Sequence, residues 1–171
     1  MVANEDKAHQ PESALIVGGG PGISASCARL FAREGMRVAV AARDPDKPVL
    51  KQLEDINAVA RYRCDAADPA SVTDLFGAVA GDLGALKLVV HNIDGRVADI
   101  FRKEITEADP ELALQTFKNG AFSAFLVARQ AATQMLARDP DKNGLRGTII
   151  FTNASAGMKG YPKSGAFAMA C

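Results

Sequence analysis

The sequence lacks an excess of charge of either sign. Lys and Arg together number 20, and Asp and Glu together number 20, so the formal net charge is zero. Electrostatic attraction to nucleic acids or to anionic membranes needs a basic excess or a run of basic residues, and the chain has neither. We therefore expect no nucleic acid and no membrane among its partners.

Cysteines are few, and none of them form a pair at metal-binding spacing. Cys27, Cys64 and Cys171 are odd in number and far apart, and the sequence contains no Cys-x-x-Cys. Scattered free thiols fit a reducing compartment. No metal site is expected.

Long apolar runs are also absent. The longest, residues 121–128, contains Ser123 and ends before Arg129, which is far short of the roughly 20 apolar residues that a membrane span needs. The N-terminus is polar and of mixed charge, without the apolar core of a signal peptide. We interpret residues 1–13 as a disordered lead-in and expect a soluble, cytoplasmic protein.

The sequence does contain short β-branched runs that alternate with longer segments of helical period. Asp68-Pro69 and Asp109-Pro110 each combine a carboxylate N-cap with a proline at the first helical position. The second pair begins a long helix to about residue 137. In the first helix, Ile23, Cys27, Leu30 and Phe31 share one helical face. Strands are predicted at 14–17, 37–42, 59–64, 86–91 and 147–152, and further helices at 23–35, 49–56 and after 68.

This alternation predicts an α/β fold over residues 14–171. A doubly wound parallel sheet with helices on both faces, in a Rossmann-type three-layer α/β/α arrangement, satisfies it. The dinucleotide-binding form of that sheet has six strands, and the chain supplies five. We therefore expect a truncated chain, with the C-terminal strands of the fold missing.

The segment VGGGPGIS, residues 17–24, lies between the first predicted strand and the first helix. Glycines there let the backbone approach a pyrophosphate, and the helix N-terminus offers free N–H groups. A nucleotide site is predicted, with a structural turn as the alternative. A P-loop would need Gly-Lys, and no lysine lies between Lys7 and Lys47. A methyltransferase usually has an acid at the end of the second strand, where this chain has Ala41 and Ala42.

Arg43 follows the second predicted strand. An acid at this position would favour NAD by binding a ribose hydroxyl, whereas an arginine can pair with the additional phosphate of NADP. The sequence thus favours NADP(H) over NAD(H) as the cofactor. The alternative is that Arg43 is a solvated turn residue.

These features resemble the short-chain dehydrogenase/reductase family. Val17, Gly18, Gly22 and Ser24 stand at the positions of its Thr-Gly-x-x-x-Gly-x-Gly motif, and HNIDG, residues 91–95, resembles its Asn-Asn-Ala-Gly. We interpret the histidine of that segment, His91, as a structural donor rather than a catalytic group. The resemblance and the loop together imply cofactor contacts at Gly18, Gly20, Pro21, Gly22, Ile23, Arg43, Asp65, Ala66 and Asn92.

The family's catalytic Asn, Ser, Tyr and Lys correspond by this resemblance to Ala121, Ala154, Phe167 and Cys171. None of the four can perform its family role. A second alignment on Tyr161 places Thr148 at the serine and Gly165 at the lysine, so the lysine is still missing. Ser155 and Asn119 lie near the serine and asparagine positions, but neither replaces the proton donor, whose loss typically costs about 10²–10⁴ in rate.

Two functions remain open from the sequence. The chain is an NAD(P)(H)-binding oxidoreductase with a non-standard active site, or a non-catalytic nucleotide-binding sensor or partner subunit on the same fold. The substrate is not indicated. The apolar face of the helix at residues 110–137 fits the homo-oligomer contact that the resemblance implies, and packing against the sheet is the alternative.

Overall fold

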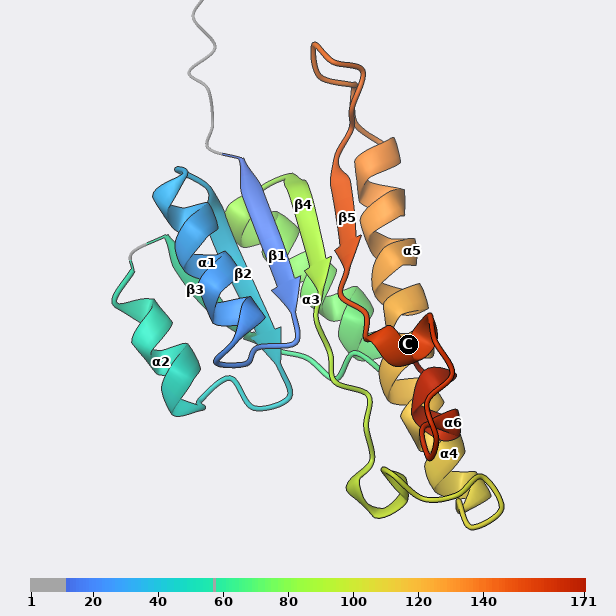
Figure 1. The fold of residues 1–171 in the computed structure, drawn as a ribbon. Helices are drawn as coiled ribbons and strands as arrows, with labels where there is room; N and C mark the ends of the chain where they lie inside the picture. Colours follow the sequence, from blue (N-terminus) through green and yellow to red (C-terminus); the bar gives the residue numbers. More distant parts are fainter. Residues whose placement is uncertain (1–11, 57) are drawn as a thin grey trace, which may run out of the picture.

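Five parallel strands form one sheet in the order β3-β2-β1-β4-β5, as Figure 1 shows for the computed structural model, which describes residues 12–56 and 58–171. The chain moves outward from β1 to β3 and then returns to β4 on the other side, as a doubly wound fold requires. The predicted parallel α/β sheet is confirmed. Its strands are β1 (Ser13–Val17), β2 (Arg37–Ala42), β3 (Val59–Arg63), β4 (Leu86–His91) and β5 (Thr148–Phe151).

The first strand begins one residue earlier than the sequence predicts. Ser13 pairs with Arg37 and Leu86 and donates a hydrogen bond of 2.8 Å from Oγ to Ala85 O. Its side chain is buried, so it belongs to the sheet and not to the predicted lead-in. The remainder of that prediction, residues 1–11, lies outside the described residues, and Glu12 precedes the strand.

Helices cover both faces of the sheet, and two separate groups of buried residues result. On one face α3 and α5 pack over Leu15, Ala39 and Val89, and on the other α1 and α2 pack over Ile16 and Val38. The three-layer prediction is therefore confirmed. The helices are α1 (Ile23–Arg33), α2 (Pro48–Glu54), α3 (Pro69–Leu83), α4 (Pro110–Phe117), α5 (Ser123–Leu136) and α6 (Gly165–Ala168).

The apolar face of α1 that the sequence predicts is only partly buried. Ser24, Ala25 and Ala28 are fully buried, whereas Ile23 and Leu30 are exposed. Small side chains let the helix lie close to the sheet, and this close approach turns the larger aliphatic residues outward. Cys27 and Phe31 are half-buried and pack against the core on this side of the sheet, so the predicted apolar face borders the most buried face without coinciding with it.

Both predicted aspartate caps are present. Asp68 accepts hydrogen bonds from Ala70 N and Ser71 N at the start of α3. Asp109 likewise caps α4, and a proline follows each of them at the first helical position. Each carboxylate satisfies backbone N–H groups that have no partner within the helix.

The long helix predicted from Pro110 to about residue 137 is not regular. Between α4 and α5 lies a π-helical turn, Lys118–Phe122, and α5 ends at Leu136. Gly120 in this turn is buried, and a Cβ there would lie 2.1 Å from Ala170 O. The turn is therefore in direct contact with the C-terminal segment, and π-turns often occur at functional sites.

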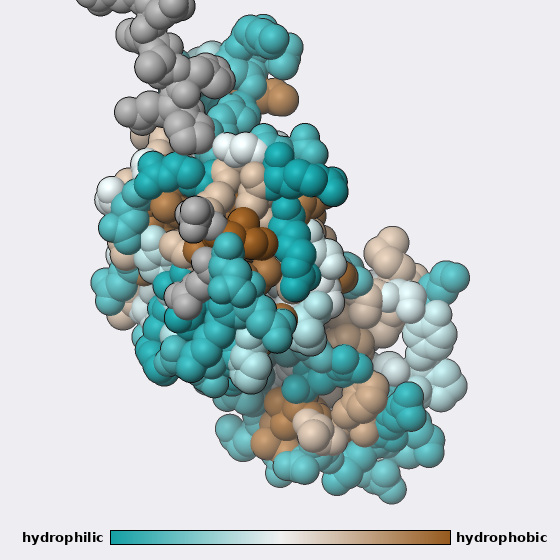
Figure 2. Space-filling model, turned by 90° about the vertical axis from the view of Figure 1, so that its left-hand side faces the viewer, coloured by the Kyte–Doolittle hydropathy of each residue, from teal (hydrophilic) through white to brown (hydrophobic). Residues whose placement is uncertain are grey.

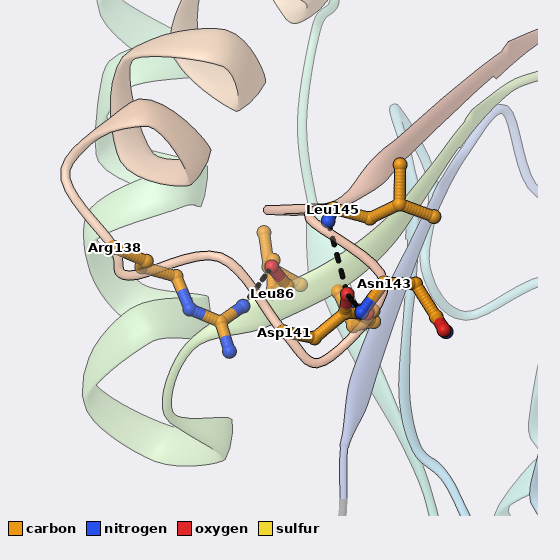
Figure 3. A network of polar contacts seen from close by, with 6 residues as sticks. Leu86, Arg138, Asp141, Asn143 and Leu145 are labelled. Carbon is orange, nitrogen blue, oxygen red and sulfur yellow. Dashed lines mark hydrogen bonds and ion pairs between the residues drawn. The ribbon is translucent and has the colours of Figure 1, made fainter.

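A polar network holds the loop between α5 and β5 against the beginning of β4 (Figure 3). Asp141 accepts hydrogen bonds from Asn143 N and Leu145 N at 2.8 and 2.9 Å and pairs with Lys87 at 2.6 Å. These hydrogen bonds lower the pKa of Asp141 to about 2, and the bond from Lys87 has the largest effect. Arg138 donates to Leu86 O at 2.7 Å. The network positions β5 beside β4.

The face on the side of α2 is mostly hydrophilic, with apolar residues only in small separate patches (Figure 2). Within the described part of the chain, no helix combines the length and the apolar character that crossing a membrane would take.

His91 ends β4 as a buried structural residue of the kind that the sequence analysis favours. Its Nε2 lies 2.8 Å from Oγ of Ser123, the first residue of α5. The serine hydroxyl has backbone carbonyl acceptors at Asn119 and Gly120, so it accepts a hydrogen bond from the neutral imidazole. Burial lowers the pKa of His91 to about 4.

We expect this buried histidine to make stability depend on pH. Its pKa is about 4 in the folded chain and about 6.5 when unfolded, so the unfolded state binds more protons between these values. The contribution is therefore constant above pH 6.5 and is lost as the pH falls toward 4. Urea unfolding should show a free energy about 2 kcal/mol lower at pH 5 than at pH 7.5 from this group alone. His91→Asn, which keeps a donor and does not titrate, should lose that difference; an unchanged pH profile would contradict the assignment.

Candidate functional site

All five strands point their carboxyl ends to the same edge of the sheet, where the segments that follow β1, β4 and β5 lie together (Figure 1). Ligands of doubly wound sheets bind at this edge, where the strand order reverses. Two cavities open there. The first, the glycine-loop cavity, has a volume of about 330 Å³ and the second, the Phe167 cavity, about 590 Å³. They share Asn92, Ile93 and Asp94 as a common wall.

The glycine loop turns sharply back over the end of β2. The N–H groups of Gly18 and Gly19 both donate to Ala41 O, at 2.9 and 3.0 Å. Gly18 has a φ of +105°, and a Cβ at this position would lie 2.1 Å from Asn92 O. Only glycine fits there. A Cβ at Gly20, by contrast, would point into open space.

The N-terminus of α1 has no capping side chain. Gly22 occupies the N-cap position and offers no side-chain acceptor, whereas α3 and α4 are both capped by aspartates. Ala25 N donates to Gly20 O at 3.2 Å, so the N–H groups of Ile23 and Ser24 are the ones available to an external acceptor at the positive end of the helix dipole. This arrangement fits a phosphate group.

Asn92 connects the glycine loop to two strands. Its Nδ2 donates to Ser24 Oγ at 2.7 Å, and its Oδ1 accepts from Thr152 Oγ1 at 2.8 Å. Ser24 in turn donates to Gly18 O, and Asn92 N donates to Val17 O at 2.8 Å. The sequence analysis gives Ser24 only a position in the glycine motif and does not identify Thr152. The signal available for Thr152 was its place directly after β5.

Most of the predicted cofactor residues line the glycine-loop cavity. Pro21 and Gly22 line neither cavity, and Ile23 lines the Phe167 cavity instead, because α1 begins there and turns this side chain outward. Those that line the glycine-loop cavity are Gly18, Gly20, Arg43, Asp65, Ala66 and Asn92.

Two cations follow β2 on the wall of the glycine-loop cavity. Arg43 is exposed, and its backbone carbonyl accepts a hydrogen bond of 2.9 Å from Arg63 Nη1. Lys47, four residues later in the same loop, lines the cavity as well. Sequence reasoning passed over Lys47, although its proximity to Arg43 in the chain was a visible signal.

Two neighbouring residues after β3 complete this wall. Asp65 is exposed, and its Oδ1 accepts from Ala67 N at 3.0 Å, which holds the carboxylate beside the cavity. Cys64 is buried, and that burial raises the pKa of its thiol. The cysteine is therefore a neutral packing residue at neutral pH.

The four residues that the sequence analysis aligns with the family's catalytic residues meet in the Phe167 cavity. Ala121 comes from the π-turn, Ala154 from the segment after β5, Phe167 from α6, and Cys171 follows α6. The structure thus gathers the positions that the sequence pattern aligned. Among these four side chains, the thiol of Cys171 is the single group that carries a dissociable proton.

The second alignment does not form a site. Thr148 begins β5 and so lies at the opposite end of the strand from the cavities, whereas Tyr161 is half exposed and lines neither of them. Ser155 also lies outside both cavities. Asn119 lines the glycine-loop cavity, where its Oδ1 accepts from Gln115 Nε2 at 2.7 Å.

Arg96 is a feature of the Phe167 cavity that sequence reasoning missed. It forms a salt bridge with Asp94 in which Nε donates to both carboxylate oxygens, at 2.7 and 2.9 Å. Hydrogen bonds from Arg96 lower the pKa of Asp94. The segment after β4 has no periodic pattern, so nothing in the sequence indicated this arginine.

No group of three or more His, Cys, Asp or Glu suited to a metal ion occurs among residues 12–56 and 58–171.

Substitution of Gly18 should damage the fold at this edge of the sheet. Gly18→Ala forces a Cβ against Asn92 O and strains a φ of +105°, so we expect a loss of at least about 2 kcal/mol in the free energy of unfolding. Gly20→Ala is the matched control, since its Cβ meets no atom within 4 Å and should change stability by less than about 0.5 kcal/mol. Chemical denaturation measures both, and equal effects would refute the steric argument.

Comparisons with known proteins agree with this geometry. A family model described as short chain dehydrogenase matches residues 12–170. Short chain aldehyde dehydrogenase 1 of Euphorbia lathyris is 24% identical over 151 residues, which cover 87% of this chain and 50% of that protein. (+)-Neomenthol dehydrogenase of Arabidopsis thaliana is 33% identical over 98 residues, which cover 52% of this chain and 33% of that protein.

A solved structure gives the same result. A variant of actinorhodin polyketide ketoreductase, crystallised with NADPH, superposes with a TM-score of 0.80 at 26% identity and covers 94% of this chain and 59% of its own. The chain spans half or less of the length of the two curated relatives above. Since the match includes the whole sheet, the glycine loop and Phe167, the chain belongs to the short-chain dehydrogenase/reductase family of oxidoreductases.

Proposed function

We propose that the chain binds NADP(H) in preference to NAD(H) and serves as an oxidoreductase with a non-standard active site. The observation that carries the proposal is the uncapped N-terminus of α1 beside a glycine-loop cavity whose wall includes Arg43 and Lys47. Free N–H groups suit the pyrophosphate, and two cations suit a further phosphate.

The two cations support the NADP(H) preference in particular. The carboxyl end of β2 carries Ala41 and Ala42, so no acid stands there to favour a ribose hydroxyl. Arg43 and Lys47 both line the cavity, and either can donate charge-assisted hydrogen bonds to phosphate oxygens. The ketoreductase relative crystallised with NADPH adds support from the family.

The bound cofactor would supply a hydride for reduction of a carbonyl or an activated double bond. The residues of the Phe167 cavity would bind and orient the acceptor, because Ile23, Phe125 and Phe151 give the cavity apolar walls. Ala121, Ala154 and Phe167 hold no proton and donate no hydrogen bond from their side chains. A suitable substrate therefore takes its proton from solvent or from a group of its own.

A second function has one specific observation in its favour. The wall of the glycine-loop cavity carries polar groups that suit a nucleotide. By contrast, the residues aligned with the family's catalytic Asn, Ser and Tyr are Ala121, Ala154 and Phe167. This asymmetry is what a non-catalytic nucleotide sensor or partner subunit would retain.

We also propose that α4 and α5 contact a second copy of the chain. Leu114, Phe117, Phe125 and Leu136 are exposed along these two helices. Burying such a row of apolar side chains against an identical row is favourable in a two-fold interface.

Nucleotide binding should be visible as stabilisation. NADPH at a hundredfold excess over its dissociation constant should stabilise the folded chain by about 2.7 kcal/mol. NADH at the same concentration should give a smaller thermal shift. Arg43→Ala and Lys47→Ala should each weaken NADPH binding by on the order of tenfold, with little effect on NADH.

Lys51→Ala removes the same charge from α2 outside the cavity and serves as the control. A larger shift with NADH than with NADPH would overturn the cofactor preference. If neither NADPH nor NADH produced a thermal shift, the oxidoreductase function and the nucleotide-sensor function would both be overturned.

If NADPH binds, its absorbance distinguishes an enzyme from a sensor. Aldehydes, ketones, quinones and enones should be tested as hydride acceptors, and turnover should persist in Phe167→Ala and Cys171→Ala because neither side chain acts as the family's donor pair. Nucleotide binding without any turnover across the panel would favour the non-catalytic function.

Self-association should depend on the exposed apolar row. Leu114→Glu places a charge in the proposed contact, so sedimentation velocity should show a shift from dimer to monomer. Leu145→Glu, an exposed leucine in the loop before β5, is the matched control and should leave the dimer intact. A monomeric wild-type chain would disprove the proposed contact.

A further inference from the structure

A third cavity, the basic pocket, adjoins the Phe167 cavity. It has a volume of about 400 Å³ and lies between the segment after β4 and the segment after β5. Three of its lining side chains are cations, and none of its lining residues is acidic. Arg96, Ala154 and Phe167 line both cavities. The polar lining residues are Arg96, Arg102, Lys163, Ser155, Tyr161 and Ser164.

Arg96 is held in a fixed orientation on the wall between the two cavities. Its bond with Asp94 engages Nε and Nη2, and Nη1 takes no part in it. The guanidinium also lies over the rings of Phe101 and Phe167, at 5.0 and 5.6 Å from their centroids. A preorganised guanidinium loses little entropy when it binds an acceptor.

The other two cations occupy strained backbone positions. Arg102 has a φ of +67° and Lys163 a φ of +60°, and no other non-glycine residue in the described ranges has a positive φ. Such conformations are unfavourable for residues with a long side chain and persist mostly at functional sites. Both strained residues line the same pocket, although they lie 61 positions apart in the chain.

The charge of the pocket is not fully compensated. Asp94 pairs with Arg96, and Glu104 pairs with Lys163 at 3.2 Å. Arg102 lies over the Phe101 ring at 5.3 Å, and within the part of the chain that the structure describes it has no hydrogen bond or ion pair. One positive charge is thus left without an acidic partner beside two others.

We propose that the basic pocket binds an anionic group, a carboxylate or a phosphate, of the substrate. The inference rests on the proposed function and specifies its substrate class. Because Phe167 and Ala154 separate the basic pocket from the larger cavity, an anion bound by Arg96, Arg102 and Lys163 leaves the remainder of the ligand beside the four catalytic positions. The substrate then combines an anionic group with an apolar body that contacts Phe125 and Phe151.

Three probes test this proposal. Isothermal titration calorimetry would compare 4-formylbenzoate, its neutral methyl ester and 4-formylphenyl phosphate, each with and without saturating NADPH. At least one anion should bind more than tenfold tighter than the ester. The stronger of the two anions identifies the group as a carboxylate or a phosphate. Equal binding of the ester and both anions would overturn the proposal.

The strained arginine provides a sharp variant. Arg102→Asn removes the charge, and asparagine tolerates a positive φ better than arginine. We expect at least a tenfold loss in affinity for the anion, no loss for the ester, and a melting temperature that is unchanged or raised. Lys142→Asn removes a charge from the exposed loop before β5 and should change none of these values. An equal loss in both variants would show a general charge effect and refute the site.

Failure of this inference can be told apart from failure of the proposed function. Arg102→Asn should keep the thermal shift that NADPH produces in the wild-type chain. Anion selectivity without any NADPH binding would support the basic pocket and reject the proposed function. NADPH binding without anion selectivity would support the proposed function and reject the basic pocket as an anion site.

Discussion

The side-chain amide of Asn92 is the interaction on which the rest of the site depends. Through Ser24 it holds the glycine loop, and through Thr152 it holds the segment that leaves β5. The two cavities meet at Asn92 itself. A single amide can serve both sides because its Nδ2 donates to one partner while its Oδ1 accepts from the other. The walls of the two cavities are thus held in place by the same group.

Much of the fold follows from the sequence, because local rules decide it. The bounds of β2 and β4 agree with their apolar runs, and the caps at Asp68 and Asp109 follow from an acid before a proline. The exceptions depend on tertiary contact. The buried face of α1 is selected by how closely the helix can approach the sheet, and the π-turn before Ser123 is accommodated by contact with the C-terminal segment.

The candidate site is likewise predictable from the sequence only in part. The glycine loop was predictable because backbone conformation and free N–H groups are specified by glycines in sequence. The partners of Asn92 and the position of Arg96 were not, since side chains from β4, β5 and α1 meet only after the sheet has formed. The glycine pattern therefore predicts the position of the glycine-loop cavity. The side chains that form the Phe167 cavity come from segments far apart in the chain, and no local pattern predicts them.

The aromatic ring of Phe167 is part of the packing at the border of the Phe167 cavity and the basic pocket. The sequence analysis aligns this residue with the family's tyrosine, and its ring packs edge-on against Phe101 at 6.2 Å while Arg96 lies over it. A phenylalanine ring makes this packing without a hydroxyl. Its face is a surface that orients the guanidinium of Arg96 at the border of two cavities, because a cation is attracted to the face of an aromatic ring.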